Sequence, residues 1–178
     1  MITLTTLIYL RRPDEILLYK PTSGPCIGKY SSFGGKMNAD EGDKTLLDCA
    51  VRETAEETGL TIKRSDFIKT GVITFRWEKE IRGFGRAGEK VTECHIYTSS
   101  KWTGDIRGTN FVTDPHWFSI SDLPWTQMMP GDKTWMSSLV DNKQFTGELG
   151  YRLDSAGDVI NTKAFLDSIP NHQQLAKL

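Results

Sequence analysis

Residues 33–60, FGGKMNADEGDKTLLDCAVRETAEETGL, decide the fold of this chain. The second half of this stretch predicts a helix that begins at Asp43 or Thr45, both common N-cap residues, and ends at Gly59. Four residues recur at helical spacing and predict the buried stripe: Leu47, Ala50, Val51 and Thr54. We therefore expect an amphipathic helix that packs on the core of the protein.

A second face of this helix carries three carboxylates: Glu53, Glu56 and Glu57. Like charges at this spacing repel one another by about 0.2–0.5 kcal/mol per pair, and a divalent cation bound by their oxygens would offset that repulsion. An acidic face in solvent is the simpler explanation of the glutamates alone. Gly34 and Gly35 favour a site, because glycine lets the backbone approach a ligand closely. Arg52 can pair with a neighbouring carboxylate and fix its direction.

The bulk properties are those of an ordinary globular protein, with 38% hydrophobic residues and a net charge of −1 over 178 residues. We expect a single domain over residues 1–178, with no membrane and no stable nucleic-acid partner, because a near-neutral surface attracts neither. The apolar run at 4–10 is too short to span a membrane, and its arginines follow it, so no signal peptide is expected. Three widely spaced cysteines predict free thiols in a reducing cytoplasm: Cys26, Cys49 and Cys94.

Extended segments surround the predicted helix. Runs of β-branched and aromatic residues predict strands at 2–10, at 15–19 after a turn, and at 68–78, 91–98 and 117–120, with a final hairpin from 144–152 to the region of Val159. Within 68–78, Phe75 and Trp77 fall on one face. A helical turn is expected at 121–124 and a second helix over Met128–Val140. Because strands and helices do not alternate regularly, the sequence predicts the α+β class.

Residues 83–88, GFGRAG, match a dinucleotide-binding pattern. That pattern requires a strand before it and a helix after it, whereas here it lies between two predicted strands. We therefore predict a hairpin tip, with Arg82, Arg86 and Lys90 in solvent and not on a phosphate.

The pattern REx2EExG over residues 52–59, following the glycines at 34–35, resembles the Nudix box. This box is the loop–helix signature of hydrolases that cleave nucleoside diphosphates linked to another group. The resemblance implies a Nudix fold, in which a mixed β-sheet is sandwiched between helices (α/β/α).

The loop half of the box departs from the family pattern. The family's glycine stands fourteen positions before the arginine, whereas Gly35 and Arg52 are seventeen positions apart, so three residues within 37–44 are inserted. The insertion puts Asp43 or Glu41 near the family's loop glutamate. It leaves the catalytic helix unchanged.

Beyond the box, the chain is most similar to the MutT-homologue branch, the oxidised purine nucleoside triphosphatases that remove 8-oxo-dGTP. The matching stretches occur in the same order and at matching separations: 6–10, 16–18, 28–36, 115–118 and 123–135. The resemblance implies hydrolysis of oxidised purine nucleoside triphosphates to a monophosphate and pyrophosphate, which cleans the nucleotide pool. It implies a small-molecule nucleotide as partner and a monomer or dimer.

The resemblance also assigns roles to residues. Mg²⁺, or Mn²⁺ in its place, would be held by the carbonyl of Gly35 and by the carboxylates of Glu53, Glu56 and Glu57. Arg52 completes the catalytic set, and either Glu56 or Glu53 would be the general base. The substrate would be bound by Thr6, Tyr30, Ser31, Phe33, Lys36, Phe75, Met129 and Asp132.

The base pocket is the part that differs from the branch. Ser31 replaces the family's asparagine, Met129 its stacking tryptophan, and Gly131 one of its two pocket aspartates. A pair of carboxylates that shares a proton can both donate to and accept from a base, whereas an ionised Asp132 alone only accepts. The family has a further glutamate in the loop before the strand at 117–120, and strict alignment places Val112 at that position. Asp114 either substitutes for this glutamate or is an ordinary turn residue.

The altered pocket leaves two other functions open. One is a Nudix hydrolase that acts on the 5′-triphosphate end of RNA or on ADP-ribose. The other is a nucleotide-binding module without activity, against which the intact set of three glutamates argues.

Overall fold

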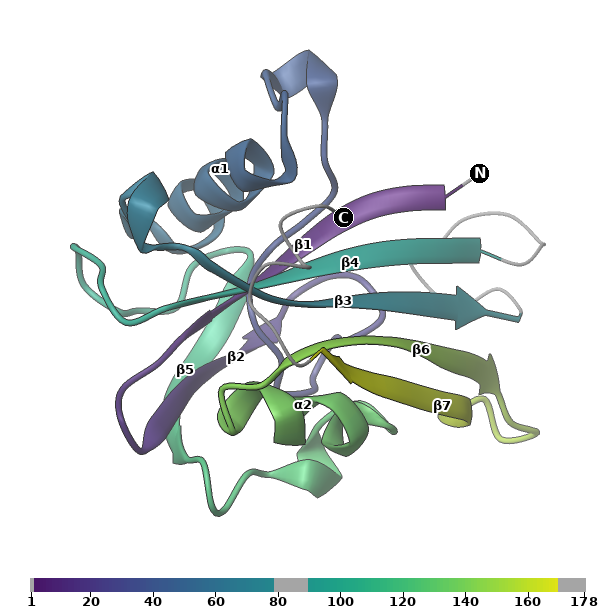
Figure 1. Cartoon of the computed structure of the whole chain (residues 1–178). Coiled ribbons are helices and arrows are strands. Elements are labelled where there is room, and N and C mark those ends of the chain that lie inside the picture. The colour runs from purple at the N-terminus through teal and green to yellow at the C-terminus, as the bar shows by residue number, and fades with distance from the viewer. Residues whose placement is uncertain (1, 79–89, 170–178) are drawn as a thin grey trace.

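A computed structural model describes residues 2–78 and 90–169. Its main feature is a five-stranded mixed sheet in the order β1-β4-β3-β6-β7 (Figure 1). The strands are β1 (Ile2–Leu10), β3 (Ile68–Trp77), β4 (Lys90–Ser99), β6 (Gln144–Leu153) and β7 (Val159–Ile169). β1 runs parallel to β4 and β3 parallel to β6, whereas the other neighbours are antiparallel. The predicted strands, the final hairpin and the α+β class are confirmed, and the glycine pattern at 83–88 lies outside the described residues.

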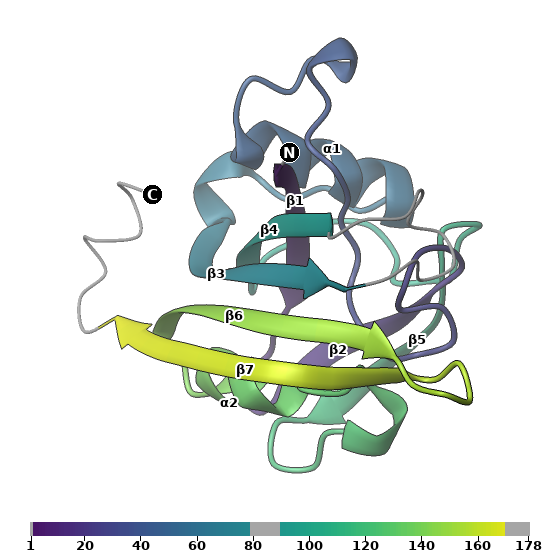
Figure 2. The ribbon, with the colours of Figure 1, turned by 90° about the vertical axis from the view of Figure 1, so that its right-hand side faces the viewer.

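Two helices, α1 (Leu46–Thr58) and α2 (Asp132–Val140), cover opposite faces of this sheet (Figures 1 and 2). The alternation of side chains along β1 separates two cores. Ile8 lies in one core with Ala50 of α1, and Tyr9 lies in the other with Trp135 of α2. The expected arrangement of a sheet between helices is therefore confirmed. Within the described residues, neither helix is long and apolar enough to cross a membrane.

Helix α1 begins after Thr45, so of the two candidate caps Thr45 is the one used. Its hydroxyl accepts from the N–H of Asp48, and the Asp48 carboxylate accepts from the N–H of Thr45, which forms a capping box. Gly59 ends the helix in the left-handed conformation, with φ of 70°. The predicted buried stripe is only partly correct. Ala50 and Thr54 are buried, but two members are half-buried, and Cys49 and Glu53 are buried instead, because the helix turns Glu53 toward the loop at 34–35.

Strand β2 (Glu15–Pro21) does not form the simple hairpin with β1 that the turn at 11–14 suggested. A single bridge joins Arg11 to Ile16, and β2 then pairs antiparallel with β5 (Val112–Ser119) in a separate two-stranded sheet. The reason is that residues 16–19 are buried on both faces and contribute to both cores. β5 begins five residues earlier than predicted, because its first half is polar and mostly exposed and gives no strand pattern.

The segment before α2 also differs from the prediction. α2 begins at Asp132, after Gly131 adopts φ of 89° as its N-cap, so residues 128–131 are not helical. The expected helical turn at 121–124 occurs instead as a 3-10 turn at Trp125–Gln127. Two other 3-10 turns are formed by Ala39–Glu41 and Arg64–Asp66.

Candidate active site

Arg52 lies at the centre of the acidic face of α1. Its Nη1 atom is 2.9 Å from Oε1 of Glu53 and 2.9 Å from Oε2 of Glu56. The repulsion expected among the glutamates is therefore offset by a cation from the same helix. Glu53 is buried, whereas the side chain of Glu56 is 51% exposed.

The inserted loop supplies two further carboxylates to Arg52. Asp43 accepts from Nε at 3.1 Å and from Nη2 at 2.8 Å, and its side chain is only 2% exposed. Glu41 lies 3.1 Å from Nη1. Asn38 caps the 3-10 turn at Ala39–Glu41, and the N–H of Asn38 donates to the carboxylate of Asp43. The insertion thus builds a compact turn that fixes the direction of the guanidinium, and the pairing of Asp43 with Arg52 could not be assigned from sequence spacing alone.

The glycine loop lies directly against the glutamates. The N–H of Gly34 donates to Oε2 of Glu57 at 2.8 Å. A Cβ atom on Gly35 would overlap the carboxylate of Glu53, so only glycine allows this approach. The carbonyl of Gly35 accepts from the N–H of Thr6 at 2.8 Å and, more weakly, from Sγ of Cys49 at 3.7 Å.

Burial shifts the titration of these groups. Desolvation raises the pKa of Glu57 to about 7 and also raises the pKa of Glu53, against the opposing effect of Arg52. The hydrogen bonds from Arg52 hold the pKa of Asp43 below its usual value. Near neutral pH, part of the protein therefore carries a protonated Glu57.

The donor set fits a hard divalent cation, because it combines three carboxylates with a backbone carbonyl at one end of a helix. Among the described residues, however, no three acidic, histidine or cysteine side chains converge closely enough to form a ready-made metal cluster. Arg52 lies between Glu53 and Glu56. Metal binding would therefore require these carboxylates to turn away from the guanidinium.

A cavity of about 780 Å³ opens beside the glutamates, and its lining also includes residues of β1, β3, β4, β6 and α2. Eleven of the predicted site residues line it: Thr6, Ser31, Gly35, Lys36, Arg52, Glu53, Glu56, Glu57, Phe75, Met129 and Asp132. The carboxylates occupy one end, and an apolar end is formed by aromatic side chains from β3, α2 and β6. This division suits a ligand with one polyanionic part and one flat heterocyclic part.

Asp132 lies at the apolar end. Its carboxylate accepts from Nε1 of Trp135 at 3.2 Å and from the N–H of Met129 at 3.2 Å. Burial nevertheless raises its pKa to about 7. The expectation that a lone Asp132 only accepts is therefore corrected: near neutral pH it is present both as an acid that donates and as a carboxylate that accepts.

Among the described residues, four aromatic side chains line the cavity without having been assigned to the site from the sequence: Trp77, Phe111, Trp135 and Tyr151. Trp77 and Tyr151 stack with ring centroids 4.7 Å apart, and both adjoin Phe75. Trp77 could have been assigned from the sequence, because it shares a face of the strand at 68–78 with Phe75. Tyr151 could not be found in this way, because it belongs to β6 and reaches β3 only through the sheet.

Two predicted substrate contacts lie outside the cavity lining. Phe33 is buried against Tyr19 in the core beneath α1. Tyr30 packs on Phe118, and its hydroxyl donates to Asp114 at 2.7 Å.

Asp114 does not join the glutamates of α1. Its carboxylate also accepts from Nζ of Lys20 at 2.8 Å, and it does not line the cavity. The idea that it replaces the family's extra glutamate is therefore not supported by its position. Val112, at the expected position, does line the cavity.

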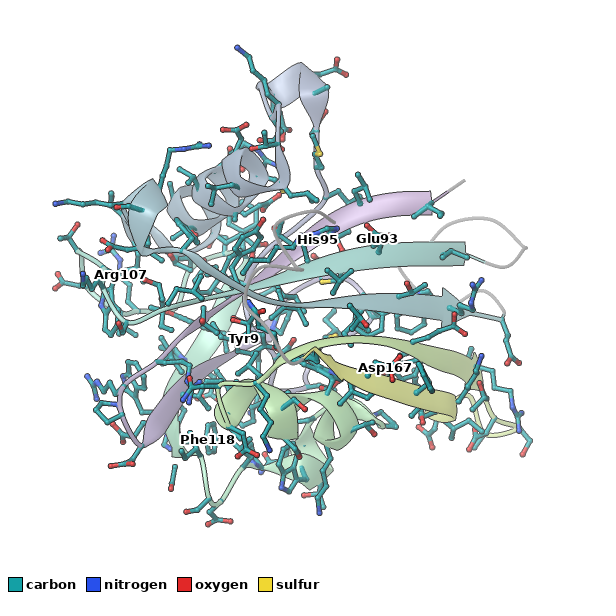
Figure 3. All side chains as sticks on the ribbon, in the orientation of Figure 1. Tyr9, Glu93, His95, Arg107, Phe118 and Asp167 are labelled. Atoms are coloured by element: carbon teal, nitrogen blue, oxygen red, sulfur yellow. The ribbon has the colours of Figure 1, made fainter. Side chains whose placement is uncertain are left out.

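The two histidines within the described residues, His95 and His116, do not line the cavity either. His95 and Glu93 are neighbours on β4, with Nε2 of His95 2.8 Å from Oε1 of Glu93 (Figure 3). The ring of His116 packs on Phe118 at 4.5 Å.

Comparisons with known proteins agree with this geometry. The oxidized purine nucleoside triphosphate hydrolase of Danio rerio is 31% identical over 157 residues, which cover 88% of this chain and 90% of that protein. The protein of the same name from Mus musculus is 27% identical over 152 residues, covering 84% and 86%.

Solved structures share the fold. The MutT protein from Bacillus halodurans superposes with a TM-score of 0.64 at 18% identity, covering 93% of this chain and 97% of that one. A MutT NUDIX hydrolase from Burkholderia pseudomallei gives 0.55 at 21% identity, covering 70% and 88%. The family model described as the NUDIX domain matches residues 1–139. The chain therefore belongs to the Nudix family of hydrolases.

Proposed function

We propose that this protein hydrolyses purine nucleoside triphosphates, oxidised purines included, to a nucleoside monophosphate and pyrophosphate. The observation that carries the proposal is the two-ended cavity, with the carboxylates of α1 beside the glycine loop at one end and Asp132 among aromatic rings at the other. The names of the two relatives from Danio rerio and Mus musculus support the same substrate class.

The polyphosphate belongs at the carboxylate end. Mg²⁺, or Mn²⁺ in its place, would be held there by Glu53, Glu56, Glu57 and the Gly35 carbonyl, and would supply charge neutralisation and activation of water. Lys36 lines this end and can contact a phosphate oxygen.

Water attack on the β-phosphorus breaks its bond to the oxygen shared with the α-phosphate and releases the monophosphate. A general base must accept the proton of that water, and the two candidates for this role are Glu56 and Glu53. Glu56 is the better placed, because its carboxyl is half exposed, whereas Glu53 is buried against the glycine loop. Arg52 positions both carboxylates through Nη1.

The purine base of the substrate belongs at the apolar end of the cavity. Phe75 and Trp77 offer flat apolar contact, and Asp132 reads the edge of the base. Because its pKa is about 7, Asp132 alone serves bases that present either a donor or an acceptor.

We also propose that the whole chain works as one domain in a reducing compartment such as the cytoplasm. Tyr151, beyond the matched residues 1–139, lines the same cavity as Glu53. Cys26, Cys49 and Cys94 are free thiols, which suits a reducing compartment.

The test is Mg²⁺-dependent hydrolysis of 8-oxo-dGTP, 2-oxo-dATP, the normal dNTPs, ADP-ribose and 5′-triphosphorylated RNA. We expect the purine triphosphates to give monophosphate and pyrophosphate, with ¹⁸O from labelled water in the pyrophosphate. Glu57→Gln should abolish most of the turnover while the protein stays folded, because it removes a carboxylate from the proposed metal site. Glu15→Gln, a surface carboxylate outside the cavity, is the matched control and should be fully active.

Other outcomes would contradict the proposal. A clear preference for ADP-ribose or RNA would refute the substrate class while keeping the family's chemistry. Label in the monophosphate would place the attack on the α-phosphorus. Full activity of Glu57→Gln would remove the assignment of the site.

A further inference from the structure

Thr92 occupies the apolar end of the cavity. It lies on β4 directly opposite Phe75 of β3 in the antiparallel register, and both residues line the cavity. Residues opposite each other in such a pair present their side chains on the same face, about 4.5–5.5 Å apart at Cβ. Thr92 therefore lies beside the aromatic side chain expected to contact the base.

Among residues 2–78 and 90–169, no group forms a hydrogen bond with the buried hydroxyl of Thr92. The residue is only 6% exposed. Buried polar atoms are nearly always paired, so such an exception calls for an explanation. In an apolar pocket, a hydroxyl that the protein leaves unpaired is available to a ligand.

Two other polar side chains at this end, Asp132 and Ser31, have partners within the protein, although the carboxylate of Asp132 keeps acceptor sites for the base. Asp132 accepts from Trp135 and from the backbone of Met129. The hydroxyl of Ser31 interacts with Tyr9 and Cys26. Thr92 contrasts with both, because its hydrogen-bonding capacity is unspent.

We propose that Thr92 is a specificity-determining residue, whose hydroxyl forms a hydrogen bond with the polar edge of the bound base. In the present rotamer the Oγ1 atom of Thr92 is buried by protein atoms, so the other atoms of the residue line the cavity. Rotation about χ1 moves the hydroxyl toward the position of the methyl group and sacrifices no hydrogen bond. A hydroxyl both donates and accepts, so it can meet an amino or a keto group. The inference rests on the proposed function.

The test compares Thr92→Val, which keeps the shape but removes the hydroxyl, with Thr92→Ser, which keeps the hydroxyl. The substrates are pairs that differ in one polar group: 8-oxo-dGTP against dGTP, and dGTP against dITP. We expect Thr92→Val to reduce the ratio of kcat/KM in at least one pair by about 2- to 12-fold, as one net hydrogen bond would. Thr92→Ser should retain the wild-type ratios.

Thr98→Val is the matched control. Thr98 lies on the same strand and the same face and is 7% exposed, but its Oγ1 is 3.0 Å from Oγ1 of Thr70. Because this variant breaks a bond within the protein, its Tm should fall by about 1–6 °C with unchanged substrate ratios. Thr92→Val should show the opposite behaviour, with no fall in Tm and a changed ratio.

The failures are distinguishable. If the wild type hydrolyses these nucleotides and Thr92→Val keeps every ratio, the inference is wrong and the proposed function stands. If the wild type hydrolyses none of them, the proposed function is wrong. Calorimetric binding of 8-oxo-dGMP, dGMP and dIMP to wild type and Thr92→Val then tests Thr92 alone, and equal affinity ratios for the two proteins overturn the inference.

Discussion

Asp132 and Arg52 illustrate how position changes the chemistry of a single residue. Asp132 is buried among apolar groups, so desolvation outweighs its two hydrogen bonds and raises its pKa to about 7. Arg52 lies among four carboxylates, and its hydrogen bonds with Asp43 raise its pKa further. Asp132 therefore has two protonation states near neutral pH, whereas Arg52 is a permanent cation.

The raised pKa of Asp132 predicts a pH-dependent cost in stability. In the unfolded chain the carboxyl ionises near pH 4, whereas in the folded protein it stays protonated until about pH 7. Between these values the unfolded state has lost its proton and the folded state has not, so the free energy of unfolding falls as pH rises. Asp132→Asn removes this dependence.

The measurement is urea unfolding of wild type and Asp132→Asn between pH 4 and pH 8. The difference in the free energy of unfolding should shift in favour of the variant as pH rises, by at most about 4 kcal/mol. A difference that stays constant over this range would show that Asp132 ionises normally in the fold.

At the scale of elements, the loop between β2 and α1 and the N-terminus of α2 set the geometry of the site. The inserted residues form a capped 3-10 turn that brings Asp43 to Arg52. Gly131 begins α2 with a positive φ, and a Cβ atom there would lie 2.8 Å from Leu149 and 2.9 Å from Asn161. Both elements are shaped by contacts with distant parts of the chain.

Asp43→Asn tests the inserted turn. Losing the charge that Arg52 binds should lower the free energy of unfolding by about 1.5–3 kcal/mol at pH 7. Because the folded pKa of Asp43 is depressed, this contribution is present above the unfolded pKa near 4 and is lost as pH falls through the folded value. Chemical unfolding at pH 7 and pH 3 measures it. Equal losses at both pH values would exclude the ion pair as the cause.

Gly131→Asp tests the departure from the family pocket. Restoring the second aspartate should destabilise this protein by about 1–3 kcal/mol, because the position has a positive φ and no space for Cβ. Gly131→Ala is the control and should lose a similar amount, which shows that the backbone and not the charge is responsible. A stable Gly131→Asp variant with improved activity on 8-oxo-dGTP would contradict this explanation.

At the scale of the whole molecule, the cavity requires strands that lie far apart in the sequence. Phe75 from β3, Thr92 from β4 and Tyr151 from β6 meet in one lining. β6 pairs in parallel with β3, so its side chains reach the cavity only when the sheet is complete.

A chain that ends at residue 140 should therefore fail to fold. The deletion removes Phe145 and Leu149, which are fully buried, and leaves β3 with an unpaired edge. Circular dichroism and thermal unfolding measure the outcome, with deletion of 170–178 as the control that keeps β6 and β7. A cooperative unfolding transition in the shorter chain would show that residues 141–169 are dispensable.

Elements whose signals are local could be predicted from the sequence alone. The position of α1 could be predicted, because the candidate caps at Asp43 and Thr45, the stop at Gly59 and the spacing of the glutamates are local signals. The choice of Thr45 as the cap and the burial of Cys49 and Glu53 could not. The boundaries of β5 and the partner of β2 could not, because strand pairing depends on residues about 90 positions away.

Only the tertiary structure decided which groups share an environment. The pKa of Asp132, the pairing of Asp43 with Arg52, the stacking of Trp77 on Tyr151 and the unpaired hydroxyl of Thr92 all depend on burial and distance. These quantities arise when segments from separate parts of the chain come together. Sequence spacing places the three glutamates on one face of α1, and packing sets the environment of each residue in the cavity.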